Sequence, residues 1–276
     1  MPGASRAWAR DLGGEATPEQ GRHPRADPGG QSDLGPGETE DPILRGRLRL
    51  LQPRRGPRVT TDPILLAHFV LRTAGVRPRR AVDLGAGSGV LALVLAAMDE
   101  RVTVLGLEIQ PALAALGRRA AARNGLEDRV RLETADLRIA APRPGGYDLA
   151  VTNPPYHAPG RGRPAALPAR ARAHHALDAS LEDLAAATRR LLAPRGQLAL
   201  IYPAEQWAEV AAVLGAVGLR PRQLRLVHPR AGRPAARLLL LAQRDVRSAC
   251  LCHPPLFLHQ GEGWSEEAAA ILEGRW

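Results

Sequence analysis

The sequence contains no lysine: its combined lysine and arginine count of 38 is made up entirely of arginine. Asparagine occurs only at Asn124 and Asn153, whereas alanine, glycine, proline and arginine are abundant. This usage is typical of GC-rich coding, which replaces lysine by arginine and raises the isoelectric point without a functional cause. The net charge of +10 therefore gives only moderate support for an anionic partner.

Cysteine and long apolar runs are also scarce. Cys250 and Cys252 cannot build a disulfide framework. Together with His253 they suggest zinc, but their spacing is shorter than that of zinc-binding pairs and no second pair exists, so we expect no metal. The longest uncharged apolar run, 84–98, is too short to span a bilayer, and no signal peptide is visible. We expect a cytoplasmic protein without membrane association that is a monomer.

The first 45 residues differ in composition from the rest of the chain. They contain 14 glycines and prolines, show no apolar periodicity, and carry five arginines against eight acidic residues. Such a segment buries too little apolar surface to offset the entropy lost on ordering, so we expect residues 1–45 to be disordered. Residues 46–276 then form one domain, which begins with a short strand and a basic turn within 46–58.

From Ala81 onward, apolar stretches typical of buried strands alternate with stretches of helical periodicity. Strands are expected at 81–84, 102–108, 130–136, 147–152 and 197–203, helices at 90–98, 111–124, 180–192 and 204–218, and an antiparallel strand pair at 222–228 and 236–243. The alternation predicts an α/β fold whose mostly parallel sheet is covered by helices on both faces.

Three acidic residues stand at the ends of three successive predicted strands. Asp83 precedes a glycine turn formed by Gly85, Gly87 and Gly89, which permits a tight strand-to-helix connection and a close approach of the backbone to a ligand. Glu108 ends the next strand, where an acid can accept hydrogen bonds from ribose hydroxyls, and Asp136 ends the third. Because ligands of open α/β sheets bind at this edge, the three carboxylates together predict one binding crevice.

The segment Asn153-Pro154-Pro155-Tyr156 follows the fourth predicted strand directly. Its two prolines hold the backbone extended and rigid, with the Asn153 amide and the Pro154 carbonyl facing the crevice beside an aromatic ring. Two oxygen acceptors and a stacking ring suit a planar NH₂ group attached to a π-system.

In this order, DLGAGSG at 83–89, Glu108, Asp136 and NPPY at 153–156 resemble the class I S-adenosylmethionine-dependent methyltransferases that methylate amino groups. Three flanking segments, TTDPILLAHF at 60–69, ARAHH at 171–175 and LVHPRAGRPAARLLL at 226–240, look like the bacterial tRNA1(Val) adenine-N6 methyltransferases, as does the final LHQGEGWSEEAAAIL. The resemblance implies a Rossmann-like fold with a seven-stranded sheet and an antiparallel C-terminal hairpin, and a methyltransferase domain over 46–276.

The resemblance also implies roles for the matching positions. Asp83, Gly85, Gly87 and Gly89 would hold the methionine part of S-adenosyl-L-methionine, Glu108 its ribose and Asp136 its adenine amino group, with Thr61 and Asp62 at the methionine end. Asn153, which also borders the cofactor, and Pro154 would orient the target amine, with Pro155 holding the turn and Tyr156 stacking on the target base. We expect no general base, because the sulfonium is already a strong electrophile and orientation supplies much of the rest.

Clusters of basic residues favour RNA, above all tRNA, as the partner. Six arginines lie within 45–58, and seven without any acid within 210–244. Phosphate contact is the expected use of arginine in such clusters. The candidate RNA-binding residues are Arg161, Arg163, Arg170, Arg172, His174, His175, Arg230 and Arg233.

Other functions fit the same motif. A protein-glutamine methyltransferase acting on release factors would use NPPY on a carboxamide NH₂, although residues 1–45 do not supply the helical N-terminal domain usual in that group. An rRNA guanine-N2 methyltransferase would use similar chemistry. A non-catalytic RNA-binding protein with a degenerate methyltransferase fold is a further alternative. The presence of every expected cofactor-binding residue argues against it.

Overall fold

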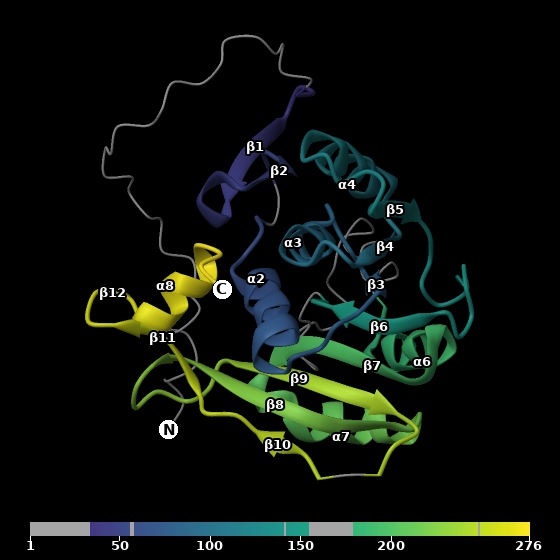
Figure 1. Ribbon diagram of the computed structural model, residues 1–276, viewed down its shortest axis with the longest axis vertical. Coiled ribbons are helices and arrows are strands. Elements are labelled where there is room, and N and C mark those ends of the chain that lie inside the picture. Colours follow the sequence, from purple (N-terminus) through teal and green to yellow (C-terminus); the bar gives the residue numbers. More distant parts are fainter. Residues whose placement is uncertain (1–33, 56–57, 141, 155–178, 248) are drawn as a thin grey trace, which may run out of the picture.

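The computed structural model describes residues 34–55, 58–140, 142–154, 179–247 and 249–276 (Figure 1). Its strands are β1 (Glu38–Ile43), β2 (Leu48–Pro53), β3 (Arg80–Leu84), β4 (Thr103–Glu108), β5 (Val130–Thr134), β6 (Tyr147–Thr152), β7 (Leu192–Pro203), β8 (Leu219–Arg230), β9 (Arg237–Arg244), β10 (Leu251–Cys252), β11 (Leu256–Gln260) and β12 (Gly263–Trp264). Its helices are α2 (Asp62–His68), α3 (Val90–Met98), α4 (Pro111–Arg123), α6 (Leu181–Leu191), α7 (Trp207–Ala216) and α8 (Glu266–Leu272), with short helical turns η1 (Leu44–Gly46), η2 (Phe69–Thr73) and η3 (Ala204–Gln206).

The large sheet has the strand order β12-β11-β8-β9-β7-β6-β3-β4-β5, with β10 pairing to β8 off this path. Strands β5, β4, β3, β6 and β7 are parallel to one another. Strand β9 runs antiparallel between β7 and β8. The predicted α/β class, the mostly parallel sheet and the antiparallel pair near the C-terminus are all confirmed.

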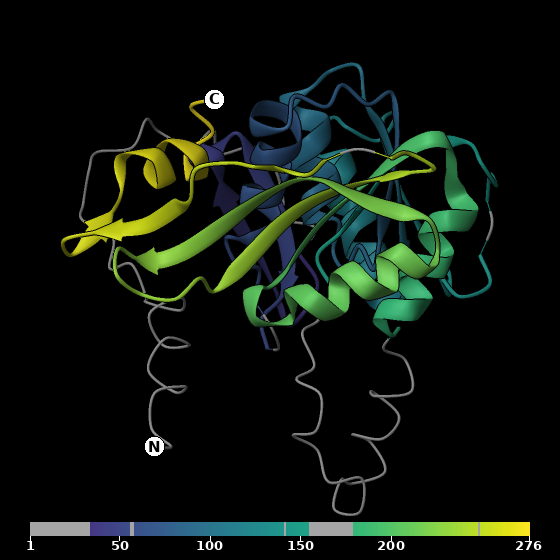
Figure 2. The same ribbon diagram turned by 90° about the horizontal axis from the view of Figure 1, so that it is seen from below.

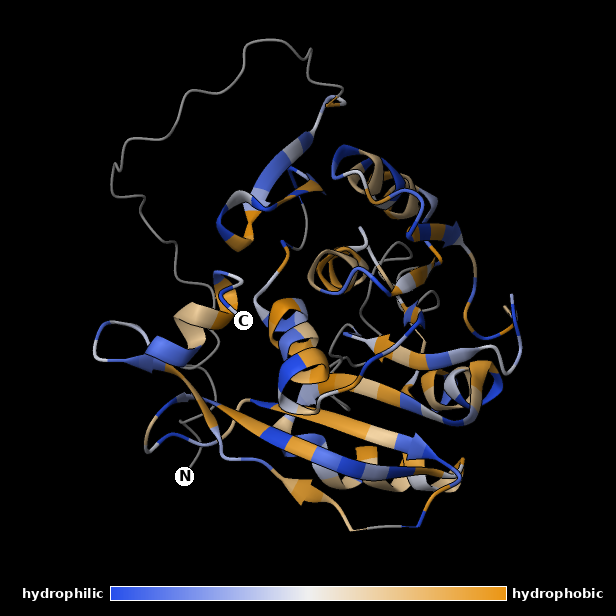
Figure 3. Ribbon diagram, in the orientation of Figure 1, coloured by the Kyte–Doolittle hydropathy of each residue, from blue (hydrophilic) through white to orange (hydrophobic). Residues whose placement is uncertain are grey.

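Alternate side chains of each central strand enter two separate apolar cores. In β7, Ala199 and Ile201 belong to the core under α2, α3 and α4, whereas Leu198 and Leu200 belong to the core under α6 and α7. Figure 2 shows α2 and α7 on opposite sides of the sheet, and Figure 3 shows the apolar character of β7, β9 and α3. Successive side chains of a strand point to opposite faces of the sheet, so a strand covered on both faces sends alternate residues into each core. Within the described ranges, no helix combines the length and apolarity needed to cross a membrane.

The predicted helix and strand boundaries hold where local signals are strong. Helix α4 begins with Pro111 in its first turn, and Gly125 follows its end with a φ of 65°. Helix α6 begins with a capping box, in which the Ser180 hydroxyl accepts from the Asp183 N–H and the Asp183 carboxylate accepts from the Ser180 N–H. These contacts pair main-chain groups that a helix start leaves unpaired.

The prediction that residues 1–45 are disordered is wrong for its last part, while 1–33 lie outside the described residues. Strand β1 pairs antiparallel with β2 in a separate two-stranded sheet. Its acids face arginines, with Glu38 bonded to Arg119 of α4 and Glu40 to Arg123, while Leu44 of the following turn is only 2% exposed. A composition averaged over 45 residues concealed this short ordered strand, whose partners come from later in the chain.

The C-terminal end of the chain extends the expected seven-stranded sheet. Strands β10 and β11 pair parallel with β8, and β12 closes a hairpin with β11, so the sheet contains ten strands among the described residues. Leu256, Leu258, Ala268 and Ile271 join the core that α2 and α3 cover. The family's seven strands form one continuous part of a wider sheet.

Candidate functional site

The carboxyl ends of the parallel strands meet at one edge of the sheet. Asp83, near the end of β3, lies beside Gly106 of β4 and Val151 of β6. The Thr152 hydroxyl at the end of β6 donates a 2.8 Å hydrogen bond to the Leu84 carbonyl and is buried. These contacts place the segment after β6 next to the glycine turn after β3, as the sequence predicts.

The glycine turn after β3 depends on left-handed backbone conformations. Gly85, Gly87 and Gly89 have φ values of 74°, 57° and 81°. A Cβ atom added at Gly85 or Gly87 would meet nothing within 4 Å, so backbone strain, not crowding, requires glycine at these two positions. At Gly89 an added Cβ would also press on Leu132, 3.3 Å away. The open space beside Gly85 and Gly87 leaves bare main chain available to a ligand.

Asp83 is a buried carboxyl group with incomplete hydrogen bonding. It is 2% exposed, and its Oδ2 atom has no hydrogen-bond partner among the described residues. Burial, with a smaller contribution from the charge of Glu108, raises the pKa of Asp83 to about 7, against a hydrogen bond from the Ala92 N–H that lowers it. An orphaned buried acceptor at this position fits a ligand that brings a positive charge or a donor.

Glu108, at the end of β4, connects the glycine turn to the start of α4. Its Oε2 accepts from the Gly87 N–H at 2.8 Å, and its Oε1 accepts from the Gln110 N–H at 2.9 Å. The Leu107 carbonyl beside it accepts from the N–H of Gly85 at 3.0 Å. A carboxylate has about four acceptor sites, so Glu108 keeps capacity for two hydroxyl donors after these bonds.

Asp136 follows β5 and forms an ion pair with Arg138, which the motifs do not predict. The Arg138 guanidinium donates to both carboxylate oxygens, with Nη2 2.6 Å from Oδ2 and Nε 2.9 Å from Oδ1. This hydrogen-bonded pair lowers the pKa of Asp136, so the carboxylate is ionised at neutral pH. The position of Arg138, two residues after Asp136, was the sequence signal that could have indicated this ion pair.

Asp62, at the start of α2, forms an ion pair with Arg237 of β9, a strand that lies between β7 and β8. Its Oδ2 lies 2.9 Å from Nε of Arg237, and the two side chains are only 6% and 12% exposed. Arg237 pairs in register with Pro203 at the end of β7, so this ion pair holds Asp62, and Thr61 before it, at the same edge as the other acids. Arg237 lies within the segment 226–240, but no pattern in the sequence distinguishes it from the other arginines there.

The NPPY segment lies only partly within the described residues. Asn153 follows β6 directly and is partly exposed, and Pro154 is buried. Arg230 ends β8, and Arg233 lies exposed in the connection to β9. Outside the described residues lie Pro155, Tyr156, Arg161, Arg163, Arg170, Arg172, His174 and His175.

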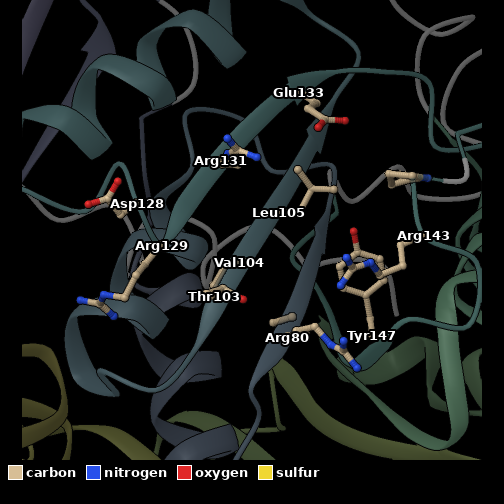
Figure 4. Close-up of a pocket in the computed structure, with 12 residues that line it drawn as sticks. Arg80, Thr103, Val104, Leu105, Asp128, Arg129, Arg131, Glu133, Arg143 and Tyr147 are labelled. Carbon is tan, nitrogen blue, oxygen red and sulfur yellow. The ribbon is translucent and has the colours of Figure 1, made fainter.

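A separate pocket of about 240 Å³ lies away from this edge (Figure 4). It is lined by residues from the first half of β3, from β4 and from β5, together with Arg143 and Tyr147. None of the glycine-turn residues, Glu108, Asp136 or Asn153 borders it. The candidate site is therefore the open edge, not this pocket.

The two cysteines near the C-terminus lie in and beside β10. Cys250 precedes the strand and Cys252 ends it, while the next residue, His253, forms a 2.7 Å hydrogen bond through Nε2 to Oε1 of Gln223. The described part of the chain holds no group of three histidine, cysteine or acidic side chains arranged to bind a metal ion.

The parallel strand order, the glycine turn and the row of carboxylates at the strand ends define a class I S-adenosylmethionine-dependent methyltransferase. A family model described as the methyltransferase small domain matches residues 61–215, more than half of the chain. The chain belongs to this methyltransferase family, and S-adenosyl-L-methionine is its cofactor.

Known relatives and a solved structure support the same assignment. The tRNA1(Val) (adenine(37)-N6)-methyltransferase of Aeromonas hydrophila is 36% identical over 192 residues, covering 68% of this chain and 78% of that protein. A protein of the same name from Yersinia pseudotuberculosis is 28% identical over 250 residues, covering 87% and 96%. The structure of a predicted O-methyltransferase from Agrobacterium tumefaciens has a TM-score of 0.62 and 25% identity, covering 78% and 96%. The family resemblance inferred from the motifs is confirmed.

Proposed function

We propose that this chain transfers a methyl group from S-adenosylmethionine to the exocyclic N6 amine of an adenine in tRNA. The observation that carries the proposal is the position of Asn153 and Pro154, directly after β6 and beside the strand that bears Asp83. The relatives named above act on adenine 37 of tRNA1(Val), and this nucleotide is the first substrate to test.

The residues at the edge suit the cofactor in shape and charge. Asp83, with its orphaned oxygen and the open space beside Gly85 and Gly87, would hold the methionine part, which carries an ammonium group. Glu108 would accept from the ribose hydroxyls and Asp136 from the adenine amino group. Bound S-adenosylmethionine supplies a methyl group attached to a sulfonium cation.

The acceptor amine is a weak nucleophile because its lone pair is delocalised into the purine ring. Hydrogen bonds from the amine to the side-chain oxygen of Asn153 and the carbonyl of Pro154 would favour a more tetrahedral nitrogen, with the lone pair directed away from the ring. Orientation of this kind supplies a large part of the barrier reduction in group transfer. The proton leaves only after the nitrogen has become cationic, so we propose no general base.

A base within a folded tRNA must leave its stack to reach this site. Unstacking costs a few kcal/mol, which contacts to the extruded base and its neighbours offset. We propose that Tyr156 stacks on the target base and that the arginines near the edge, among them Arg230 and Arg233, contact the flanking phosphates.

The test uses labelled S-adenosylmethionine, the purified chain and tRNA that lacks the modification, followed by digestion and nucleoside mass spectrometry. The expected product is N6-methyladenosine, and its position is mapped by comparing tRNA1(Val) with a variant that carries guanosine at position 37. Label in release factor, but none in RNA, would overturn the proposal in favour of glutamine methylation. Label recovered as N2-methylguanosine would also overturn it.

A further inference from the structure

Beyond β8, the large sheet exposes a face that no described helix covers and that carries rings and one guanidinium. In the register of β8 and β11, Phe257 lies opposite His228 and His259 opposite Arg230, while Trp264 of β12 lies opposite His259. The intervening residues Val227, Leu256 and Leu258 enter the core under α2 and α8. Because side chains alternate along a strand, the five polar and aromatic side chains share the opposite face.

We call this set, His228, Arg230, Phe257, His259 and Trp264, the ring platform. The His259 and Trp264 rings are stacked, with centroids 4.4 Å apart and planes 20° from parallel. The His228 and Phe257 rings lie 5.4 Å apart. Phe257 is 37% exposed and Trp264 40% exposed, although aromatic residues make up only 3% of the chain. Coding bias explains the many arginines but not this exposure of scarce rings.

Charged groups of both signs border the ring platform. The Arg230 guanidinium donates to the Gly261 carbonyl, which holds it against the β11–β12 turn. Nδ1 of His228 is hydrogen-bonded to the carbonyl of Arg233, 2.7 Å away. Acids lie on the β12 side, where the turn contributes Glu262 and the start of α8 contributes Glu266 and Glu267, whereas β8 and its connection to β9 contain none.

The ring platform extends to the same edge of the sheet as the candidate active site. Strand β8 runs parallel to β7, because both are antiparallel to β9, and β11 is parallel to β8. The carboxyl ends of β8 and β11, at Arg230 and Gln260, therefore point the same way as the end of β6, which carries Asn153. One extended ligand can reach both.

We propose that the ring platform binds unpaired nucleotides of the substrate RNA by stacking, across β9 and β7 from the nucleotide that enters the active site. Exposed rings on a sheet face, interleaved with a guanidinium, are how proteins hold single-stranded RNA, since every base offers a flat face. The proposal rests on the proposed function, because it names the part of the substrate that this face recognises. Binding of a protein partner to the same face is the alternative that the second experiment tests.

The first experiment measures steady-state methylation of tRNA by Trp264→Ala and Trp264→Phe. Loss of one stacked base is expected to raise KM for tRNA about tenfold, with kcat and the Kd for S-adenosylmethionine unchanged. The phenylalanine variant keeps a stacking ring and should stay within about threefold of the wild type. Leu251→Ala, which removes an exposed apolar side chain of β10 outside the ring platform, is the matched control. An unchanged KM in Trp264→Ala would overturn the proposal.

A second experiment separates the ring platform from the proposed function. Binding of a short single-stranded RNA, followed by fluorescence anisotropy in the absence of cofactor, should weaken about tenfold in Trp264→Ala and in Phe257→Ala. If the wild type binds this RNA but methylates no tRNA, the proposed function fails and the ring platform stands. If both variants bind RNA like the wild type but lose self-association, the face is a protein contact and the proposal is overturned.

Discussion

The two halves of the sheet edge present opposite chemistry. On β3, β4 and the segment after β5 the edge carries carboxylates, of which Asp83 and Glu108 are buried. On β8, β11 and β12 it carries imidazoles, aromatic rings and Arg230. The first half suits a cationic methyl donor and the second a polyanion with flat bases. Strand β6, which ends next to Asn153, lies between the halves.

If the proposed function holds, charge would sort the two substrates along this edge. A sulfonium compound would gain nothing from Arg230 and the imidazoles of the second half, and RNA phosphates would be repelled by the carboxylates of the first. The ion pair between Asp62 and Arg237 ties α2 to β9, which lies between the two halves.

The largest effect on activity is expected from Asn153, which follows β6 between the two halves. Asn153→Ala should lower kcat for methyl transfer about a hundred- to thousandfold, because the amine loses an oriented acceptor, and leave the Kd for S-adenosylmethionine unchanged. Single-turnover kinetics and equilibrium dialysis measure the two quantities. The matched control is the chain's other asparagine, Asn124, whose amide joins α4 to β2 through the Arg49 backbone. Asn124→Ala should cost stability, not kcat, and retained transfer in Asn153→Ala would contradict the mechanism.

Breaking the ion pair between Asp62 and Arg237 is expected to lower the free energy of unfolding. Arg237→Ala removes the guanidinium that faces the buried Asp62 carboxylate, which should lower the free energy of unfolding by about 3 kcal/mol in urea denaturation. The double variant Asp62→Ala, Arg237→Ala should be more stable than Arg237→Ala alone, since it leaves no buried charge at this position. Strict additivity of the two single losses would show that the two residues do not act as a pair.

The carboxylate half should show a pH dependence centred on Asp83. Its pKa of about 7 means that the free protein must lose a proton there before it can pair with an ammonium group. The Kd for S-adenosylmethionine should therefore fall as the pH rises from about 6 to 8, and Asp83→Asn should weaken binding about tenfold and abolish this dependence. Isothermal titration calorimetry in buffers of different ionisation enthalpy would detect the released proton. A flat profile in the wild type would contradict the assignment.

Asp83 should also affect folding stability, with a defined sign. Between its ordinary value of 3.8 and about 7, the folded protein holds a proton that the unfolded chain has lost. The contribution of Asp83 to stability therefore decreases as the pH rises through this window. Asp83→Asn should remove this decrease, which denaturation curves recorded at pH 5 and pH 8 would test.

The smallest effect is expected where the C-terminus packs on α2. The Trp276 ring lies edge-on to His68 at 5.1 Å and under the Arg72 guanidinium at 5.9 Å, so Trp276→Ala should cost about 1 kcal/mol. Burial, with the nearby Arg225, lowers the pKa of His68 to about 4, so stability falls as the pH drops from 6.5 toward 4. Exposure of His68 in the variant should weaken this fall, and urea denaturation at both pH values measures it.

The sequence predicts those parts of the fold whose signals are local. Helix α3 and the turn before it follow from nine consecutive apolar residues after Gly89, and the positions of Asp83 and Glu108 follow from the strand ends. Strands β1 and β12 escaped prediction because they are short hairpin strands without apolar alternation, and β11 because it pairs with β8, which lies well before it in the chain. The same holds for the bond between Asp62 and Arg237, since no periodicity relates residues that only the folded sheet brings together. The site residues stay predictions in their roles, although their convergence follows from topology.

The packing of α8 against α2 has a consequence for the nascent chain. Helix α2 is among the first elements to leave the ribosome, but part of its surface packs against α8, which is the last helix of the chain. During synthesis this surface stays without its cover, and a contact between distant segments closes slowly. Because α2 carries Asp62 at its start, the position proposed for the methionine end of the cofactor would be fixed only when the C-terminal helix has docked. A ribosome that stalls before β11 would release a chain with an exposed apolar helix, a substrate for chaperones and proteases.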